Sequence, residues 1–389
     1  MKKKIAILGS TGSIGKSLIE IIKNDKKRFE ILLLTANKNY KELFKQAKIF
    51  RVKNIIISDE KSYKILKKKN RDKKIKIFND FKELNKIFKS KVDYTMSAIS
   101  GLDGLDPTLQ IIKKTKKIAI ANKESIICGW NLILKELKKH NTDFIPVDSE
   151  HFSIWSLIKN YNHKLIDKIY ITASGGPFLK WPLSKIKKVT PSKALKHPNW
   201  SMGKKISVDS STMMNKVFEV IETQRIFNLE KSKIRILIHE KSYVHAIVQF
   251  KNGLKKILVH DTNMKIPIFN TLYNDTKEIK FIKSENLDIT KLNNLNFRKL
   301  DEKRFPLIKI LNKISNKSSL FETVLISAND ELVNLFLKKK MSYSRLQKNL
   351  LTIINLSEFD HFRKKIPKNL NEINQLNDHV RLKIRELCI

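Results

Sequence analysis

The first part of this chain contains the sequence KIAILGSTGSIGKSLIEIIKNDKKRFEILLLTA at residues 4–36, which carries the clearest secondary-structure pattern. Residues 5–8 are an apolar run, residues 15–23 have the spacing of an amphipathic helix, and residues 29–34 are a second apolar run. The sequence therefore predicts a β-α-β unit, in which a helix connects two parallel strands.

A glycine-rich turn, GSTGSIG at residues 9–15, lies between the first strand and the helix. Glycine permits a tight turn and lets the backbone approach a pyrophosphate, whose negative charge the helix N-terminus favours. The spacing is GxxGxxG rather than the more usual GxGxxG, so a purely structural turn is the alternative. The position of the turn inside the β-α-β unit favours a dinucleotide site.

The end of the second strand indicates which dinucleotide binds. NAD sites usually place an acidic residue there, to hold the ribose hydroxyls. Here the sequence is TANKN, residues 35–39, with no acid and with Lys38 in place. A cation suits a 2′-phosphate, so we expect NADP rather than NAD, unless Lys38 is one more surface lysine.

Strand and helix patterns along the chain predict the domain organisation. Short apolar runs alternate with helical patterns at residues 55–57, 75–78, 92–98, 118–121 and 144–147. This alternation predicts a Rossmann-like, doubly wound parallel sheet. Later runs, KIYITAS, KIRILIHE, HAIVQF and KKILVH, lie among longer loops, and helical spacing continues from residue 305. We expect an α/β protein with a dinucleotide-binding domain at 1–148, a central α+β domain at 149–275, a polar linker at 276–300 and a C-terminal helical domain at 301–389.

The composition is strongly basic, with 79 lysines and arginines against 38 acidic residues and a net charge of +41. The lysines are scattered along the chain, which favours a drift toward A/T-rich codons over nucleic-acid binding, although polyanion binding and an acidic small substrate remain alternatives. No apolar run approaches the roughly 18–20 residues that a membrane span needs. Two cysteines, Cys128 and Cys388, suit a reducing compartment, and we expect a cytoplasmic protein.

Two segments carry acidic residues in positions that suit a divalent metal. In IPVDSEH, residues 145–151, Asp148 and Glu150 follow a strand, and their hard oxygen atoms suit Mg²⁺ or Mn²⁺. A pair of acids at the start of a loop is also common without a metal, so an ordinary acidic loop is the alternative. In residues 208–227, Ser210 or Ser211 is expected to cap a helix whose polar face carries Asn215, Lys216 and Glu219. Such a face can hold a phosphate or polyol and complete a metal site, with an ordinary solvated face as the alternative.

Two loops between these segments suit an anionic substrate. The turn at Ser174, in TASGGPFLKWP at residues 172–182, offers a hydroxyl and free backbone N–H groups to an anion. In HPNWSMGKK, residues 197–205, Trp200 and Met202 follow neither helical nor strand spacing. We interpret this loop as a cover that excludes water from a bound substrate, with a piece of buried core as the alternative.

Together these motifs resemble the 1-deoxy-D-xylulose-5-phosphate reductoisomerase family. The resemblance is carried, in order, by GSTGSIG (9–15), ANKES (121–125), PVDSEH (146–151), SGGPF (174–178) and HPNWSMGKKISVDSSTMMNK (197–216). It is dense up to about residue 270 and thinner beyond. It implies NADPH-dependent, metal-dependent rearrangement and reduction of 1-deoxy-D-xylulose 5-phosphate to 2-C-methyl-D-erythritol 4-phosphate, in a homodimer. We expect no specific nucleic-acid partner, because the sequence has no motif that combines aromatic and basic residues for stacking on bases.

The resemblance also implies a role for each matching residue. NADPH contacts fall on Thr11, Gly12, Ser13, Ile14, Asn37, Lys38, Asn39 and Asn122, with Glu124 and Gly203 nearby. The metal, Mg²⁺ or Mn²⁺ with Co²⁺ as an alternative, falls to Asp148, Glu150 and Glu219. Substrate hydroxyls fall to Lys123 and Ser149, and the phosphate to Ser174, Ser210, Asn215 and Lys216. A flap at 174–205 contains His197, Trp200 and Met202.

Several positions depart from the family pattern without removing a predicted metal or phosphate ligand. Asn37 and Val217 stand where glycine is usual, Ala173 precedes Ser174 in place of glycine, and Glu240 replaces proline. At Asn37 the replacement suggests a backbone with positive φ, which asparagine tolerates better than most residues. Semialdehyde dehydrogenases share a similar glycine turn but need a catalytic cysteine, and neither cysteine of this chain suits that role.

Overall fold

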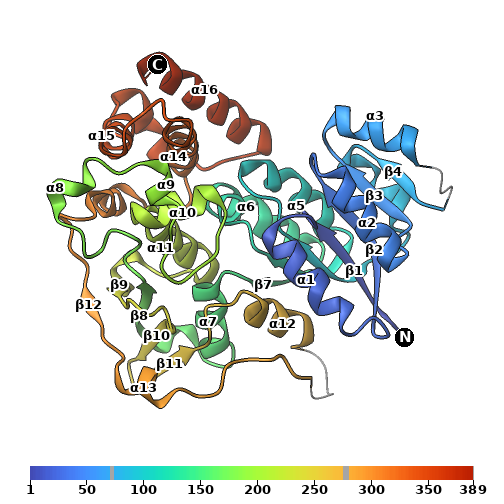
Figure 1. Ribbon diagram of the computed structural model, residues 1–389, viewed down its shortest axis with the longest axis horizontal. Helices are drawn as coiled ribbons and strands as arrows, with labels where there is room; N and C mark the ends of the chain where they lie inside the picture. Colours follow the sequence, from blue (N-terminus) through green and yellow to red (C-terminus); the bar gives the residue numbers. More distant parts are fainter. Residues whose placement is uncertain (71–73, 275–279, 389) are drawn as a thin grey trace. The chain divides into compact units, whose positions relative to one another are not determined.

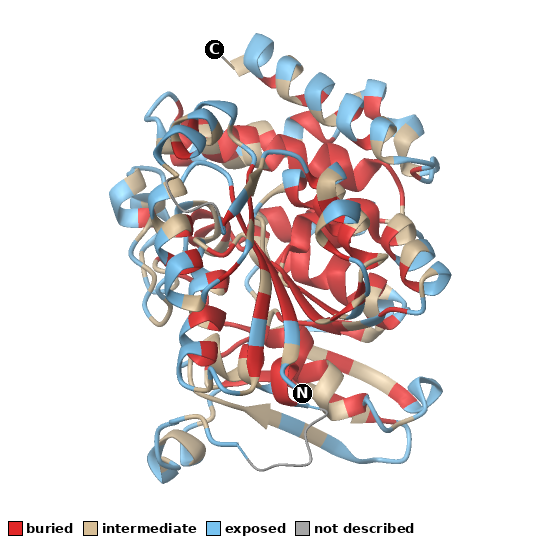
Figure 2. Cartoon of the chain, turned by 90° about the vertical axis from the view of Figure 1, so that its right-hand side faces the viewer, coloured by how far each residue is buried: buried red, intermediate tan, exposed pale blue. Residues whose placement is uncertain are grey.

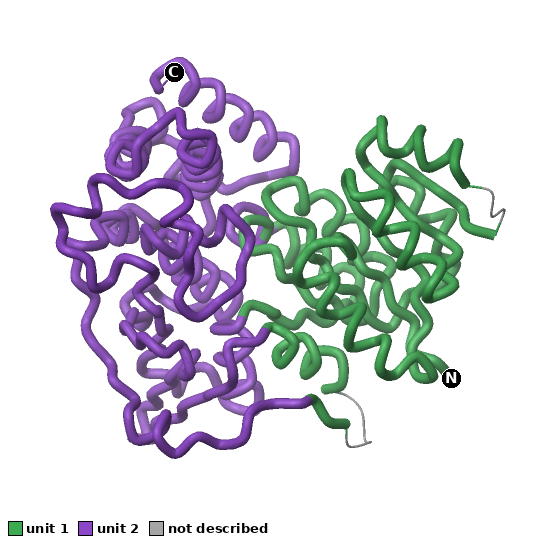
Figure 3. The backbone as a smooth tube through the Cα atoms, viewed as in Figure 1, with its two compact units in different colours: residues 1–125, 132–148, 264–282 green, residues 126–131, 149–263, 283–389 purple. Residues whose placement is uncertain are grey.

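The computed structural model describes residues 1–70, 74–274 and 280–388 (Figure 1). Two compact units are distinguished by their internal contacts and are coloured separately in Figure 3. Unit 1 comprises residues 1–125, 132–148 and 264–282, and unit 2 comprises residues 126–131, 149–263 and 283–389. The predicted division into three domains stays a prediction. Positions 275–279, which comprise the last position of the predicted central domain and the first four of the predicted linker, lie outside the described residues.

Unit 1 is built on a parallel sheet that has seven strands within the described residues, in the order β4-β3-β2-β1-β5-β6-β7. The strands are β1 (Lys3–Leu8), β2 (Phe29–Ala36), β3 (Asn54–Ile57), β4 (Lys76–Phe78), β5 (Val92–Ser97), β6 (Thr115–Ile120) and β7 (Asp143–Pro146). The strand order reverses between β1 and β5, which is where doubly wound sheets bind ligands at their carboxyl ends. The α/β class and the Rossmann-like sheet are confirmed.

The helices of unit 1 connect and cover these strands. They are α1 (Ser13–Lys23), α2 (Tyr40–Phe50), α3 (Glu60–Lys69), η1 (Phe81–Glu83), α4 (Leu84–Ile87), η2 (Leu102–Gly104), α5 (Leu105–Ile112), α6 (Lys123–Lys139, of which 126–131 group with unit 2) and α12 (Lys265–Tyr273). The α1 helix buries Leu18, Ile21 and Ile22 in an apolar core with strand residues such as Ile5, and buried residues are red in Figure 2. Amphipathic spacing thus fixes the helix against the sheet.

A late segment of the chain returns to unit 1 as helix α12. The Tyr94 hydroxyl of β5 and Thr271 of α12 are hydrogen-bonded at 2.8 Å, with both side chains buried. The Tyr273 ring packs edge-on against Phe29 at 5.5 Å. Because these contacts join residues far apart in sequence, local periodicity does not reveal where α12 packs.

Unit 2 contains a mixed sheet that has five strands within the described residues, in the order β11-β10-β8-β9-β12. The strands are β8 (Ile166–Ala173), β9 (Ile234–Ile238), β10 (Val244–Phe250), β11 (Lys255–Val259) and β12 (Arg298–Lys299). Only β8 and β9 pair in parallel among these described strands. The helices α7 (Ser149–Ile158) and α11 (Met214–Phe227) share an apolar core with this sheet, so their polar residues are fixed relative to it.

The remaining helices of unit 2 include the helical C-terminal part that the sequence predicts. They are η3 (His163–Leu165), α8 (Leu183–Ile186), α9 (Pro191–Ala194), α10 (Lys204–Ser211), η4 (Lys231–Lys233), α13 (Ile289–Asn293), η5 (Pro306–Lys313), α14 (Phe321–Leu337), α15 (Tyr343–Ile353), η6 (Ser357–Arg363) and α16 (Leu370–Cys388). Among the described residues, no helix combines the length and apolar character that crossing a membrane requires.

Candidate active site

The glycine turn of unit 1, residues 9–15, leaves no space for a side chain at Gly9 or Gly15. Gly9 adopts a φ of +78°, and a Cβ atom there would lie 2.6 Å from the carbonyl oxygen of Ala98. A Cβ atom at Gly15 would lie 2.4 Å from the carbonyl oxygen of Gly9. Both positions therefore need glycine, and the turn leads directly into the N-terminus of α1, which is the arrangement that binds pyrophosphates.

The residues after β2 are exposed and carry no acid, as expected for an NADP site. The Asn39 side chain accepts a hydrogen bond from the backbone N–H of Glu42 at 3.2 Å and so caps α2. The Asn37 side chain donates to the Ser58 hydroxyl at 3.2 Å. Asn37 is not among the described residues with positive φ, so that expectation was wrong. Lys38 is exposed at the carboxyl end of the second strand, where a 2′-phosphate would be bound.

The carboxyl ends of β6 and β7 bring a buried lysine to an aspartate. Asn122 caps α6, since its Oδ1 accepts from the Ser125 backbone N–H at 2.6 Å. The next residue, Lys123, is 8% exposed, and its Nζ lies 2.9 Å from Oδ2 of Asp148. Two predicted site residues that follow adjacent strands thus meet at the carboxyl ends of the sheet, where α/β proteins bind ligands.

In unit 2, one lysine lies between two carboxylates. The Nζ of Lys216 on α11 lies 2.6 Å from Oε1 of Glu150 on α7, and it also forms an ion pair with Glu219. Carboxylate oxygens of the two glutamates lie within 4.8 Å of each other. Glu219 is only 1% exposed. Buried charges are tolerated only when they are paired, so this cluster is held together by mutual compensation.

The ionisation of Lys216 follows from the same contacts. Burial alone lowers the pKa of the ammonium, but the charges of Glu150 and Glu219 outweigh that effect, and the pKa is raised above its usual value. Lys216 is therefore a cation at neutral pH. The Asn215 side chain donates a hydrogen bond to the Glu219 carboxylate, so three predicted site residues of α11 are brought together.

Sequence reasoning missed a histidine that supports this cluster. The Nε2 of His151 lies 3.0 Å from both the Glu219 carbonyl oxygen and the Thr223 hydroxyl, and its Nδ1 lies 3.4 Å from Oε2 of Glu222. His151 is fully buried, and Glu222 is 2% exposed. Outer groups of this kind orient the residues that contact a ligand. The signal in the sequence was the histidine that directly follows Glu150.

The Ser174 turn and His197 also meet in unit 2. Nδ1 of His197 accepts hydrogen bonds from the backbone N–H groups of Asn199 and Trp200, at 3.1 and 3.0 Å. Its proton is therefore on Nε2, which lies 3.0 Å from the Ser174 hydroxyl. Burial, with a smaller effect from the Lys216 charge, lowers the pKa of His197 to about 4. The imidazole is neutral at pH 7 and donates to Ser174.

The predicted helix cap at Ser210 or Ser211 was wrong. Ser210 belongs to α10, which ends at Ser211, and α11 begins only after Met213, whose φ of 66° is left-handed. The sequence does not reveal the kink between α10 and α11. Both helices have buried residues next to the kink, so the helical spacing of apolar residues continues across it. Ser210 still lies beside the Ser174 turn, since a Cβ atom at Gly176 would come 2.9 Å from the Ser210 carbonyl oxygen.

The other predicted site residues of the loop 197–205 are Trp200, Met202 and Gly203, and none of them is fully buried. Trp200 is half-buried, and its ring centroid lies 6.0 Å from that of His245. The Asn199 side chain donates to the Ser242 hydroxyl at 2.9 Å. Met202 is half-buried and Gly203 is exposed, both in the segment before α10.

A second buried group, His245, was also missed by the sequence analysis. Its ring stacks on His260 at 3.7 Å between centroids. Burial, together with the charge of His260, lowers the pKa of His245 to about 3. No motif distinguishes these histidines. They are fifteen residues apart, since His245 lies on β10 and His260 directly follows β11.

A glycine-turn dinucleotide unit, together with a unit of buried acids, lysine and anion-binding turns, defines an NADP-dependent oxidoreductase that acts with a divalent metal. Family models of 1-deoxy-D-xylulose 5-phosphate reductoisomerase match residues 5–129, and models of its C-terminal domains match residues 144–227 and 260–383. The chain belongs to the 1-deoxy-D-xylulose 5-phosphate reductoisomerase family. This membership confirms the resemblance drawn from the motifs.

Individual relatives agree with the family assignment. The reductoisomerase of Pelagibacter ubique is 60% identical over 389 residues and is covered over its whole length, as is this chain. That of Wolbachia pipientis wMel is 41% identical over 347 residues, or 88% of each chain. The solved reductoisomerase of Zymomonas mobilis in complex with NADPH has a TM-score of 0.87 at 32% identity, covering 100% of this chain and 99% of that chain. A reductoisomerase in complex with NADPH, fosmidomycin and magnesium has a TM-score of 0.90 at 30% identity, covering 99% and 98%.

Proposed function

We propose that this protein converts 1-deoxy-D-xylulose 5-phosphate to 2-C-methyl-D-erythritol 4-phosphate, with NADPH as reductant and a divalent metal as cofactor. The observation that carries the proposal is the buried cluster of Glu150, Lys216 and Glu219. The carbon skeleton of the ketose phosphate rearranges to an aldehyde, and a hydride from NADPH reduces that aldehyde. Family membership and the glycine turn support the cofactor.

The carboxylates of unit 2 fit a divalent metal. Glu150 and Glu219 already converge on one cation, the Lys216 ammonium, and their hard oxygen atoms suit Mg²⁺ or Mn²⁺. We assign the metal to these two residues and to Asp148, which precedes Glu150 by two positions at the end of unit 1. When bound, such a metal acts as a Lewis acid that polarises the substrate carbonyl.

If the metal takes the place of Lys216 as the partner of the two glutamates, Lys216 can bind the substrate. With Glu150 and Glu219 engaged as metal ligands, the Lys216 ammonium would be available to a phosphate, which we assign to Lys216 with Ser174, Ser210 and Asn215. The neutral His197 fixes Ser174 through the hydrogen bond to its hydroxyl. Lys123 and Ser149 are assigned to the substrate hydroxyls, and Trp200 and Met202 to a cover that excludes water.

For NADPH, we assign the contacts to the glycine turn and to the residues that follow β2 and β6. The turn contributes Thr11, Gly12, Ser13 and Ile14, and the other positions are Asn37, Lys38, Asn39, Asn122, Glu124 and Gly203. In this assignment the turn binds the pyrophosphate through backbone N–H groups, and Lys38 binds the 2′-phosphate.

A homodimer and a cytoplasmic location complete the proposal. The homodimer is implied by the family resemblance, and its test is the mass of the protein in solution by light scattering. We infer the location from the two cysteines, neither of which forms a disulfide bond in the part of the chain that the structure describes.

The direct test of function is oxidation of NADPH, followed by absorbance, with 1-deoxy-D-xylulose 5-phosphate as substrate. We expect oxidation only when the ketose phosphate and Mg²⁺ or Mn²⁺ are both present, with 2-C-methyl-D-erythritol 4-phosphate as product. Oxidation that is unchanged after metal chelation would contradict the proposal, as would the absence of product under all conditions.

A further inference from the structure

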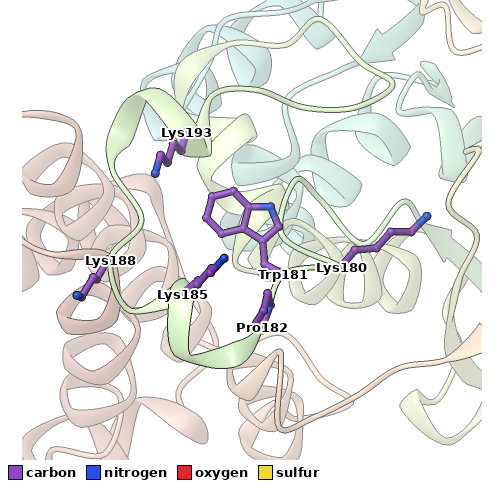
Figure 4. Close-up of a pocket in the computed structure, with 6 residues that line it drawn as sticks. All are labelled: Lys180, Trp181, Pro182, Lys185, Lys188 and Lys193. Atoms are coloured by element: carbon purple, nitrogen blue, oxygen red, sulfur yellow. The ribbon is translucent and has the colours of Figure 1, made fainter.

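A cavity in unit 2 is lined mostly by lysines and contains none of the residues assigned to the active site. It has a volume of about 440 Å³ and is lined by Lys180, Trp181, Pro182, Lys185, Lys188 and Lys193 (Figure 4). Cavities of roughly 300–1,000 Å³ accommodate small organic ligands. The cavity lies within the predicted flap region 174–205, but it is formed by the segment between the Ser174 turn and the His197 loop.

The indole of Trp181 is fixed in this cavity. Its ring packs edge-on against Phe178 at 4.9 Å, and Phe178 packs in turn against Tyr343 at 5.7 Å. Phe178 and Tyr343 are 2% and 1% exposed, so the indole rests on the buried core. The Arg304 guanidinium donates hydrogen bonds to the carbonyl oxygens of Phe178 and Trp181, at 2.9 and 2.8 Å. The aromatic wall is therefore prepared before any ligand arrives.

The charge around the indole is poorly compensated. Lys193 Nζ lies 5.5 Å from the centre of the indole, and Figure 4 shows the Lys185 ammonium pointing toward the same ring. Lys185, Lys188 and Lys193 form no ion pair with a carboxylate among the described residues. Lys180 points away from the indole and pairs with Glu240 at 2.7 Å, and Glu240 also pairs with Arg298.

Codon drift does not account for this distribution of charge. The 38 acidic residues amount to about one in ten along the chain. Residues 179–208 contain eight lysines and not one aspartate or glutamate. Lysine stems give the cavity apolar walls while their ammonium groups stay in water, ready to bind an anion.

We propose that this cavity binds a nucleoside triphosphate, whose base stacks on Trp181 and whose phosphates contact Lys185, Lys188 and Lys193. An aromatic side chain next to several ammonium groups is the combination that binds nucleotides, because stacking and charge act on different parts of one ligand. Inorganic polyphosphate could contact the lysines, but it has no base to stack on the Trp181 indole. No residue that lines this cavity is among the residues assigned to the proposed reaction.

The test is calorimetric titration of ATP into the full-length protein, with saturating NADPH to occupy the dinucleotide site. We expect one ATP per chain. Replacing Lys185 and Lys188 together by serine is expected to weaken binding at least about tenfold. The matched control replaces Lys187 and Lys196, two exposed lysines of the same segment outside the cavity lining, by serine. This control is expected to change ATP affinity less than about threefold, because it removes the same charge without removing a contact.

Stacking of the base on Trp181 is tested separately. Trp181→Leu is expected to weaken ATP binding at least about tenfold and Trp181→Phe by less than about threefold. Tripolyphosphate is expected to bind at least about tenfold more weakly than ATP. Affinity for NADPH and the melting temperature, measured on every variant, are expected to stay unchanged, which shows that the variants are folded.

Three results would overturn the proposal. Equal losses in the cavity variant and the matched control would show only diffuse attraction between a basic surface and an anion. Equal affinities for ATP and tripolyphosphate, or an unaffected Trp181→Leu variant, would remove the base from the site. No saturable ATP binding in the presence of NADPH would remove the site itself.

Discussion

Helices α1 and α11 each contribute to a predicted ligand site, but they do so in opposite ways. The α1 helix buries one face, and the ligand site lies at its N-terminus, in backbone groups of a glycine turn. The α11 helix is buried along nearly its whole length, with Lys216, Glu219, Glu222 and Arg225 among its buried residues. A site made from backbone needs little room, whereas a site made from charged side chains needs a partner for every charge.

The largest expected effect concerns the charge that anchors α11. The Arg225 guanidinium pairs with Glu322 on α14 and donates to the carbonyl oxygens of Ser315, Asn316 and Lys317. Arg225→Met leaves a buried carboxylate without its partner, and we expect a loss of about 3–5 kcal/mol in the free energy of unfolding. Urea denaturation followed by circular dichroism measures it.

An exposed ion pair of α1 provides the control for the buried ion pair of α11. Glu20 forms an exposed ion pair with Lys265 at 2.6 Å. Glu20→Gln is expected to cost less than about 1 kcal/mol, because exposed pairs contribute little. If the two variants were equally stable, buried pairing would not be what distinguishes α11.

The second expected effect is acid sensitivity in unit 2. The folded pKa of His245 is about 3, against 6.5 for the free group, so the unfolded chain binds the extra proton below pH 6.5. The free energy of unfolding therefore falls as the pH drops from 6.5 toward 3. The loss is about 2 kcal/mol at pH 5 and is complete below about pH 3. The measurement is the difference in urea denaturation between pH 8 and pH 5 for the wild type and for His245→Gln. Parallel pH profiles for the two proteins would show that His245 is not buried as a neutral group.

The third prediction concerns unit 1, where a single exposed lysine is expected to select the cofactor. Lys38→Glu should raise the Michaelis constant for NADPH on the order of tenfold and that for NADH by less than about threefold, because only NADPH carries a 2′-phosphate. Steady-state kinetics with both cofactors measure the two effects. Equal changes for the two cofactors would make Lys38 an ordinary surface residue.

The smallest expected effect on stability is that of Trp200, in the loop before α10. Trp200→Ala should cost less than about 1 kcal/mol, whereas removing a core tryptophan costs about 3–5 kcal/mol. Trp130, which is 8% exposed, provides the core control. The same variant should impair substrate binding, and residues 197–205 should become resistant to protease when metal, NADPH and substrate are bound. A large stability loss together with unchanged proteolysis would instead make Trp200 part of the core.

The sequence predicted the parts of the molecule that depend on local patterns. The β1-α1-β2 unit follows from apolar spacing and from glycines whose neighbours leave no room for a side chain. The predicted residues Glu150, Lys216 and Glu219 do come together. Glu150 lies in the PVDSEH motif and Lys216 ends the DSSTMMNK motif, and Glu219 follows three residues later on the same helix.

The sequence did not predict what depends on distant partners. Helical spacing continues through the kink at Met213, so the start of α11 was misplaced. The spacing also left open whether Lys216 and Glu219 were solvated, since their burial depends on α7 and the sheet. The Arg225–Glu322 pair joins residues 97 positions apart, and no local pattern links them.

The assignment of the metal to the buried carboxylates is tested by the affinity of the ligand-free protein for Mn²⁺, measured by electron paramagnetic resonance. Glu219 and Glu222 are buried glutamates one turn apart on α11, but Glu219 faces Glu150 whereas Glu222 faces His151. If Glu219 is a metal ligand, Glu219→Gln raises the dissociation constant at least about tenfold, and Glu222→Gln raises it less than about threefold. A greater loss for Glu222→Gln, or equal losses for both, would contradict the assignment of the metal to Glu150 and Glu219.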